Sequence, residues 1–419
     1  MTSSAFSLTF GIFIGATLLA RLWLSFRQIR HVRACRDKVP AQFAARIPLA
    51  AHRKAADYTV AKCRFALYMT GVDTLVLLCF TLFGGLDALA GCLLGMTGPG
   101  MLFQLSLLTA FAVISGLIDL PFDYYRQFVI EEAFGFNRMS RRLFFADLLK
   151  STVIGALIGI PVVWLALVIM EKAGNAWWLY AWILWIAFQT LMMVLYPTVI
   201  APRFNTFAPL EDTALRERIE RLLARTGFTS NGLFVMDGSR RSSHGNAYFT
   251  GFGAGKRIVF YDTLIARLSP PEIEAVLAHE LGHFRLRHIV RRMVVMGAAS
   301  FGFLALLGYL KAHDWFYLGL GVIPLPGMSN DAMALVLFAL ILPLLTFFFS
   351  PLLSASSRRH EFEADAFAAR YASAQDLGSA LVRLVEDNAS TLTPDPLYSA
   401  FYDSHPPAGI RIGKLLPDT

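Results

Sequence analysis

Seven apolar stretches, each long enough to cross a lipid bilayer, constrain the fold of this chain more than any other sequence feature. A helix needs about 20 mainly apolar residues to cross the hydrocarbon core. Hydrophobic residues make up 56% of the 419 residues and charged residues only 16%, a balance outside the range of soluble globular domains. We therefore predict an all-α integral membrane protein with seven transmembrane helices. The stretches are residues 6–26, 65–84, 101–121, 152–170, 176–197, 293–310 and 333–352.

The placement of basic residues predicts the orientation of these spans. Residues 27–64 hold ten Lys and Arg against two Asp, so this one loop carries as much net charge, +8, as the whole chain. Short loops rich in Lys and Arg remain in the cytoplasm. We therefore expect loops 27–64 and 122–151, and the stretches 198–292 and 353–419, to be cytoplasmic and the N-terminus to be extracytoplasmic. Because the net positive charge lies in one short loop between two spans, it indicates membrane orientation and predicts no nucleic-acid partner.

An H-E-x-x-H motif at residues 279–283 predicts a metal site on a helix. The Ser-Pro-Pro-Glu capping box at 269–272 begins this helix, and apolar residues follow at helical spacing. His279 and His283 are four residues apart and so face the same point, as two nitrogen ligands of Zn²⁺ must. Glu280 can accept a proton from a water that zinc activates. The alternative is a helix with two exposed histidines and a surface glutamate.

A second motif, Arg-Arg-His-Glu-Phe-Glu-Ala-Asp at 358–365, can complete the site. Helical phase puts Glu361 and Asp365 on one face, so Glu361 can bind zinc while Asp365 accepts the second ring N–H of a ligating histidine. Glu363 points to the opposite side and is the weaker candidate. Taken alone, such a run is more often a solvated helix face, but the preceding H-E-x-x-H motif favours the ligand role. If the helices run unbroken into spans six and seven, the metal lies about 15 Å from the membrane boundary.

Strand-like sequence occurs only between the fifth and sixth spans. Residues 246–251 and 257–261 are rich in aromatic and β-branched residues, and the Gly-rich segment between them predicts a β-hairpin. Leu233–Met236 is a candidate for a third strand. An edge strand near the metal could bind a substrate backbone, although a purely structural hairpin explains the sequence equally well.

These features divide the chain into four parts around a cytosol-facing catalytic domain of the zincin type. The parts are the membrane domain 1–197 with five spans, the catalytic segment 198–292, spans six and seven at 293–352, and the C-terminal catalytic segment 353–419.

The chain resembles the type I CAAX prenyl endopeptidases, membrane zinc proteases related to the HtpX proteases. The resemblance covers nearly the whole length. It implies seven spans around a water-filled chamber and a substrate that is a membrane-associated or lipidated peptide or protein, prenylated C-a-a-X proteins among them. The motifs that carry it are residues 131–137, 202–212, 242–249, 279–283, 358–365 and 405–407, with Arg411 following.

The same resemblance assigns roles to individual residues. Glu280 would be the general base of peptide hydrolysis, Asp365 would support a zinc ligand, Asn246 would contact the substrate backbone, and His405 would stabilise the oxyanion. We expect one Zn²⁺ per chain and a monomer in the bilayer. The implied zinc ligands are His279, His283 and Glu361.

Two other functions and the origin of the chain stay open at this stage. A zinc-binding transporter or channel would use intramembrane acids, of which Asp73 and Asp119 are the main ones, and neither has an obvious basic partner in a span. A non-catalytic binder of lipidated proteins would be favoured by loss of Glu280, which is present. The short N-terminus and the lack of a lysine-rich C-terminal signal favour a bacterial inner-membrane protein.

Overall fold

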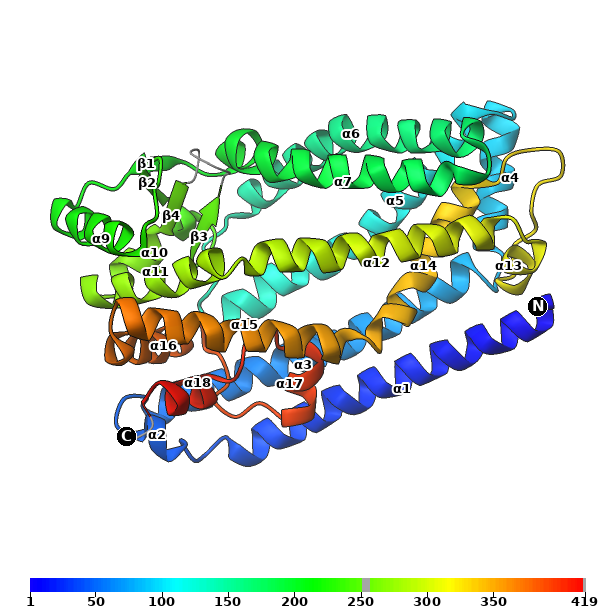
Figure 1. The fold of residues 1–419 in the computed structure, drawn as a ribbon. Helices are drawn as coiled ribbons and strands as arrows, with labels where there is room; N and C mark the ends of the chain where they lie inside the picture. The colour runs from blue at the N-terminus through cyan, green and yellow to red at the C-terminus, as the bar shows by residue number, and fades with distance from the viewer. Residues whose placement is uncertain (251–256, 417–419) are drawn as a thin grey trace.

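Long helices that lie side by side make up most of the molecule (Figure 1). The computed structural model describes residues 1–250 and 257–416. Within these residues, six helical spans are long and apolar enough to cross a membrane, and a bent helix pair raises the number to seven if it is one span. The predicted mainly helical membrane fold is thus confirmed. The six spans are Ser3–Cys35, Leu49–Phe80, Met101–Glu131, Arg141–Lys172, Gly174–Phe204 and His288–Lys311.

Most of these spans correspond to single α-helices. The third and fifth continue through π-helical turns beyond α5 and α7, and the fifth ends in the short helix α8 (Ala201–Phe204). The helices concerned are α1 (Ser3–Cys35), α3 (Leu49–Phe80), α5 (Met101–Tyr125), α6 (Arg141–Lys172), α7 (Trp177–Leu195) and α12 (His288–Lys311).

The seventh span is bent, which the sequence analysis did not anticipate. α14 (Asp331–Phe347) and α15 (Ser350–Tyr371) meet at 63°. Pro351 lies in the first turn of α15, where its missing N–H costs nothing but prevents α14 from continuing. α11 (Pro270–Arg285) also ends before α12, at Arg287 in the left-handed conformation with φ 58°. The expectation of unbroken helices is therefore wrong on both sides of the motifs, and the depth of about 15 Å derived from it does not hold.

Three short helices lie in segments predicted as loops. α4 (Gly85–Thr97) is apolar and buries Leu86 and Ala90 against the helical bundle, where they join Phe103 and Phe316 in the largest core cluster. The other two are α2 (Ala41–Ala44) and α13 (Asp314–Gly319). α4 and α13 lie at one end of the molecule and α2 lies at the other (Figure 1).

A four-stranded mixed sheet lies at one end of the molecule. Its order is β1-β2-β4-β3, with β2 and β4 parallel and the outer pairs antiparallel. The predicted hairpin is confirmed by the pairing of Tyr248 in β3 with Val259 in β4, and the third strand is β2. Residues 251–256 of the connection lie outside the described residues. The strands are β1 (Phe207–Pro209), β2 (Leu233–Met236), β3 (Ala247–Thr250) and β4 (Arg257–Tyr261).

The helices around this sheet carry both metal-site motifs. Ile258 and Phe260 of β4 are fully buried and join the core of this end of the molecule with Leu277 of α11. The C-terminal helices pack against α15. The two termini lie at opposite ends of the molecule (Figure 1). The motifs themselves lie on α11 and α15, and the remaining α-helices are α9 (Thr213–Thr226), α10 (Asp262–Arg267), α16 (Ala374–Asp387), α17 (Pro396–Tyr402) and α18 (Ala408–Leu415).

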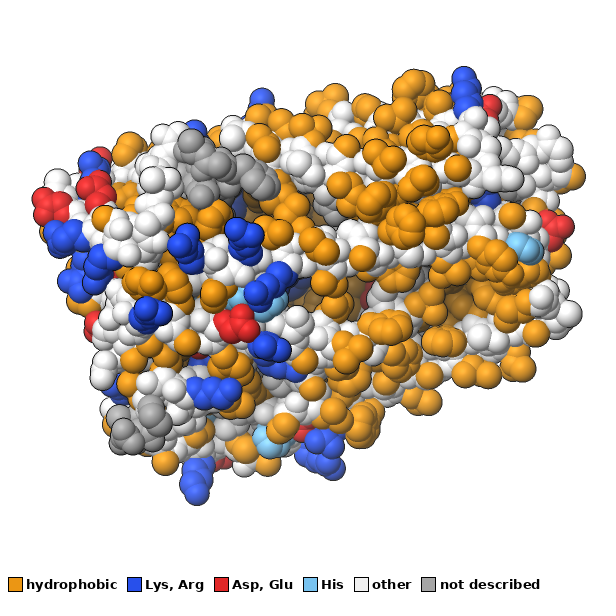
Figure 2. Space-filling model, viewed as in Figure 1, with side chains coloured by type: hydrophobic (Ala, Val, Ile, Leu, Met, Phe, Trp, Pro, Cys, Tyr) orange, Lys and Arg blue, Asp and Glu red, His pale blue; other side chains and the backbone are white. Residues whose placement is uncertain are grey.

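Charged side chains gather at the same end of the molecule. Figure 2 shows most of the visible Lys, Arg, Asp and Glu over the end that carries α9, α11 and α16, whereas hydrophobic side chains cover the long helices. An apolar surface of this extent is unfavourable in water and favourable in a lipid bilayer. The distribution indicates a membrane-embedded bundle with a polar end that holds the sheet and the metal-site helices.

Candidate metal centre

The H-E-x-x-H motif lies on α11 as the sequence predicts. The backbone N–H of Ser269 donates to Glu272 Oε2 at 2.8 Å, which confirms the capping box at the start of the helix. Helical phase then brings the Nε2 atoms of His279 and His283 to 3.1 Å from each other. The two imidazoles point to one place at the side of α11.

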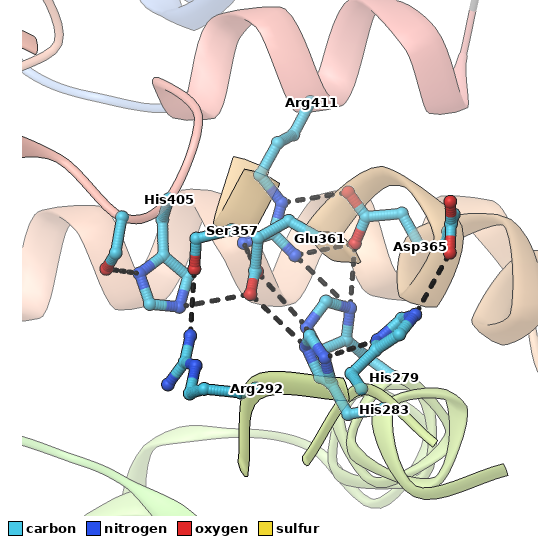
Figure 3. A network of polar contacts seen from close by, with 11 residues as sticks. His279, His283, Arg292, Ser357, Glu361, Asp365, His405 and Arg411 are labelled. Carbon is cyan, nitrogen blue, oxygen red and sulfur yellow. Dashed lines mark hydrogen bonds and ion pairs between the residues drawn. The ribbon is translucent and has the colours of Figure 1, made fainter. Parts of the chain in front are cut away.

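Glu361 reaches this place from α15, across the helix interface (Figure 3). Its Oε1 lies 3.2 Å from His283 Nε2, and its Oε2 lies 3.4 Å from His279 Nε2. One ligand atom from each of the three residues lies within 4.8 Å of the others. Tetrahedral ligands of Zn²⁺ at about 2.0–2.1 Å from the ion are about 3.3 Å apart. The spacing and the two-nitrogen, one-oxygen donor set both fit zinc.

A buried carboxylate oxygen supports the same assignment. Among the described residues, Glu361 Oε2 has no hydrogen-bond partner although it is buried. Its nearest polar neighbours, His279 Nε2 at 3.4 Å and Arg411 Nη1 at 3.5 Å, make only long contacts, and a metal ion in the ligand triangle would satisfy it directly.

Asp365 and Arg411 form a layer behind His279. Asp365 Oδ1 lies 2.8 Å from His279 Nδ1, so the predicted support of this ring is in place. Arg411 donates through Nε and Nη2 to both oxygens of Asp365, at 2.8 and 2.5 Å. Burial alone would raise the pKa of Asp365, but the hydrogen bonds from His279 and Arg411 outweigh it and lower the pKa. Asp365 is thereby held as an anion that accepts the His279 N–H.

Arg411 is a site residue to which the sequence analysis assigned no role. It lies on α18, 46 residues after its partner Asp365. Its side chain is only 8% exposed. Arg411 follows the His-Pro-Pro motif closely, and this position was the only hint in the sequence that it belongs to the site. No spacing rule connects a residue in one helix with a carboxylate in another.

Glu363 lies outside the ligand triangle. Its carboxylate contacts His288 at 3.0 Å and Arg359 at 3.1 Å instead. The metal-ligand group found among the described residues contains Glu361 and not Glu363. The helical phase that made Glu363 the weaker candidate accounts for this difference.

Glu280, Asn246 and His405 line one cavity of about 840 Å³ next to the ligand triangle. His405 lies in the loop between α17 and α18, with Nε2 3.4 Å from Glu361 Oε1 and a side chain 66% exposed. Asn246 directly precedes β3, the strand at the edge of the sheet. Burial raises the pKa of Glu280 above its ordinary value. The fold thus brings all the predicted site residues together.

The walls of this cavity include membrane helices. Gln28 from α1 and Lys62 and Ala66 from α3 line it together with residues of α11, α15 and α16. A volume of this size falls within the range of pockets that bind a ligand or a short peptide segment. The cavity therefore joins the metal site to the membrane bundle.

Two motifs that carried the family resemblance contact each other beside the cavity. Asn137 forms a β-bridge with Ser242, and the ring of His244 stacks on Phe136 with centroids 4.6 Å apart. His244 Nδ1 also lies 2.9 Å from Asn388 Oδ1. The loop after the third span thereby holds the segment that leads to Asn246.

A second cavity, of about 280 Å³, lies among α1, α3, α5 and α14. Asp73 and Asp119 line it, and so does Arg21 from the first span. Arg21 thus shares a cavity with both acids, and the sequence did not reveal this because spacing does not show which faces of different helices meet.

Two family descriptions match consecutive parts of the chain. The first, CAAX prenyl protease N-terminal, five membrane helices, matches residues 28–206, and the second, peptidase family M48, matches residues 209–417. CAAX prenyl protease 1 of Saccharomyces cerevisiae is 34% identical over 94% of this chain and 91% of its own length. The human CAAX prenyl protease 1 homolog is 31% identical over 96% of this chain and 94% of its own length.

The fold is similar to a solved structure as well. The crystal structure of S. mikatae Ste24p superposes with a TM-score of 0.91 at 32% sequence identity, covering 98% of this chain and 99% of that one. These relatives are eukaryotic proteins and give no support to the bacterial origin expected from the chain ends, which stays a prediction.

Proposed function

The chain belongs to the CAAX prenyl protease 1 family of M48 zinc metalloproteases, and we propose that its substrates are membrane-associated or lipidated proteins, with prenylated C-a-a-X tails foremost. The observation that carries this proposal is the cavity of about 840 Å³, which Glu280 and His279 share with Lys62 and Ala66 of a membrane helix. A substrate that is anchored in the bilayer by a lipid can occupy such a cavity while its peptide lies at the metal site.

In this proposal His279, His283 and Glu361 hold one zinc ion per chain. When bound, zinc supplies a Lewis acid that polarises the scissile carbonyl and makes water a nucleophile near neutral pH. Glu280 accepts the proton of the attacking water and returns it to the leaving amine. Because burial raises its pKa, the Glu280 carboxylate is a better proton acceptor than an exposed glutamate.

His405 and Asn246 bind the reacting peptide in this proposal. The imidazole of His405 opens into the cavity beside Glu361 and can donate an N–H to the developing oxyanion. Asn246 and the free edge of β3 can align an extended substrate backbone. The same cavity supports binding and hydrolysis, and we propose that a monomer is sufficient for both.

We further propose that the site faces the cytosol. Loop 27–64, which carries the net charge of +8, includes α2 at the same end of the molecule as the sheet and the C-terminus (Figure 1). The N-terminus lies at the opposite end. If the basic loop remains in the cytoplasm, the metal site does too.

The direct test is cleavage of matched peptides by the purified protein in detergent. One C-a-a-X peptide is prepared with a farnesylated cysteine, with an S-alkyl cysteine of similar length, and with a free cysteine. We expect cleavage of the lipidated peptides, inhibition by o-phenanthroline with recovery on addition of zinc, and no cleavage by Glu280→Gln. Equal cleavage of the free-cysteine peptide would contradict recognition of the lipid. Failure to cleave any of the three by zinc-loaded protein would contradict the substrate class.

A further inference from the structure

The second ring nitrogen of His283 meets another histidine. His283 Nδ1 lies 3.0 Å from Nδ1 of His288, and His288 Nε2 lies 3.0 Å from Glu363 Oε2. The His288 side chain is only 4% exposed, whereas Glu363 at the end of the row is 32% exposed. Side chains from α11, α12 and α15 thus form a row that ends in a carboxylate.

The donor and acceptor roles in this row follow from metal binding at Nε2 of His283. A neutral imidazole that uses the Nε2 lone pair for a metal carries its proton on Nδ1. That N–H can only donate to Nδ1 of His288, which must then carry its own proton on Nε2. The Nε2–H of His288 in turn donates to the Glu363 carboxylate. One arrangement of protons therefore satisfies all three side chains.

A break between two helices makes this contact possible. On an unbroken α-helix, residues five apart are about 140° apart around the axis, so His288 would point away from His283. Instead α11 ends at Arg285, and Arg287 takes a left-handed conformation with φ 58° and ψ 32° before α12 begins. A non-glycine residue in this conformation costs about 1 kcal/mol or more. The turn directs His288 back to the metal site at that cost.

We propose that His288 and Glu363 are positioning residues for the zinc ligand His283, and that they do through an imidazole what Asp365 does directly for His279. This inference rests on the zinc site proposed above. Outer partners of ligating histidines fix the ring orientation and raise its basicity, and their loss typically costs about 10- to 100-fold in metal affinity. Glu363 ends the row with a carboxylate that contacts His288. Any effect of Glu363 on the zinc ligand His283 therefore passes through His288.

A second metal ion at His288, His360 and Glu363 is the competing explanation. The rings of His288 and His360 are stacked, with centroids 4.1 Å apart and planes 12° apart. Ring nitrogen lone pairs lie in the ring plane, so the lone pairs of two stacked rings do not converge on one ion. Both nitrogens of His288 also have partners already. The geometry therefore favours a hydrogen-bonded row.

Two substitutions of His288 separate its two contacts. Asn places an acceptor near the Nδ1 position and keeps the contact with His283, whereas Gln reaches the Nε2 position and keeps only the contact with Glu363. We expect His288→Gln and His288→Ala to raise the zinc Kd by about 10- to 100-fold. His288→Asn and Glu363→Ala should raise the zinc Kd by the same amount, about 10-fold or less. Adding Glu363→Ala to His288→Asn should raise the zinc Kd no further, because both substitutions remove the same contact between residues 288 and 363.

Zinc affinity is measured by chelator competition on the purified full-length protein, and the ligand field by absorption of the Co²⁺-substituted forms. Arg359→Gln is the matched control, since it removes a partner of Glu363 that does not contact His288 and should leave the zinc Kd unchanged. Wild-type protein that binds no zinc would refute the proposed function itself. Wild-type zinc binding with equal Kd in all His288 variants would refute only the positioning role, and so would additive effects of the two substitutions. Two zinc ions per wild-type chain, falling to one in Glu363→Ala, would overturn it in favour of a second site.

Discussion

Gly282 sets the distance between the two helices that hold the metal ligands, and replacing it with alanine tests this directly. A Cβ on Gly282 would lie 3.0 Å from Ala364 Cα, 3.1 Å from Phe367 Cβ and 3.3 Å from Ala364 O, against 3.4–4 Å for ordinary contacts. Two of these three atoms belong to the backbone of α15 and cannot move away by a change of rotamer. The helices must therefore separate by a few tenths of an ångström.

This separation acts on the zinc site because the ligands lie on both sides of the interface. Glu361 precedes Ala364 by nearly one turn of α15, while His279 and His283 flank Gly282 on α11. Zinc–oxygen bonds are about 2.0–2.2 Å long and vary by only about 0.2 Å, so a shift of a few tenths of an ångström is enough to disturb one. Overpacking costs about 1–3 kcal/mol, which corresponds to about a 5- to 150-fold rise in zinc Kd if the site bears the strain.

The assay is chelator competition for zinc together with thermal unfolding of the apo and zinc-loaded protein. Gly413→Ala on α18 is the matched control, because a Cβ there meets nothing within 4 Å. Alanine is favoured over glycine inside a helix by about 0.5–1 kcal/mol, so this control should be neutral or slightly stabilising. Wild-type zinc affinity and wild-type peptide cleavage in Gly282→Ala would refute the view that this close approach sets the ligand geometry.

The remaining predictions concern the reaction and the topology. Glu280→Gln should retain stoichiometric zinc by elemental analysis and lose hydrolysis, because the carboxylate transfers protons and is not a ligand; wild-type turnover would exclude this mechanism. His405→Ala should lower kcat by about 10² with zinc content and KM little changed, as expected for an oxyanion donor; a kcat within a few-fold of wild type would leave His405 a surface residue. A protease-accessible tag on Met1 should be cut in intact cells or sealed right-side-out vesicles, whereas a tag on Thr419 should be protected; the reverse pattern would overturn the cytosolic site.

The parts of this structure that the sequence predicted are those fixed by local periodicity. The capping box at 269–272 determines where α11 begins, and four-residue spacing determines that His279 and His283 share a face. Aromatic and β-branched residues on both sides of a Gly-rich segment predicted the hairpin of β3 and β4 in the same way. Each of these signals depends on neighbours within one element, so no knowledge of the tertiary fold was needed.

The parts that the sequence did not predict depend on contacts between distant elements. Arg411 reaches Asp365 only because α18 folds back over α15. His288 reaches His283 only because α11 breaks at Arg287, a residue type that gives no signal for a left-handed turn. Sequence spacing therefore pointed to the proposed ligands but not to most of the side chains that contact them.

The membrane helices are part of the active site and not only its anchor. Gln28 and Lys62 place α1 and α3 directly in the wall of the cavity that holds Glu280. The lining also includes apolar side chains such as Leu377 and Leu381 of α16. A cavity with polar groups near the metal and apolar groups beside them matches a peptide that carries a lipid better than it matches a freely soluble peptide. The metal-site segments would lose part of the cavity lining if they were separated from the bundle, so the proposed specificity for lipidated chains would be a property of the whole protein.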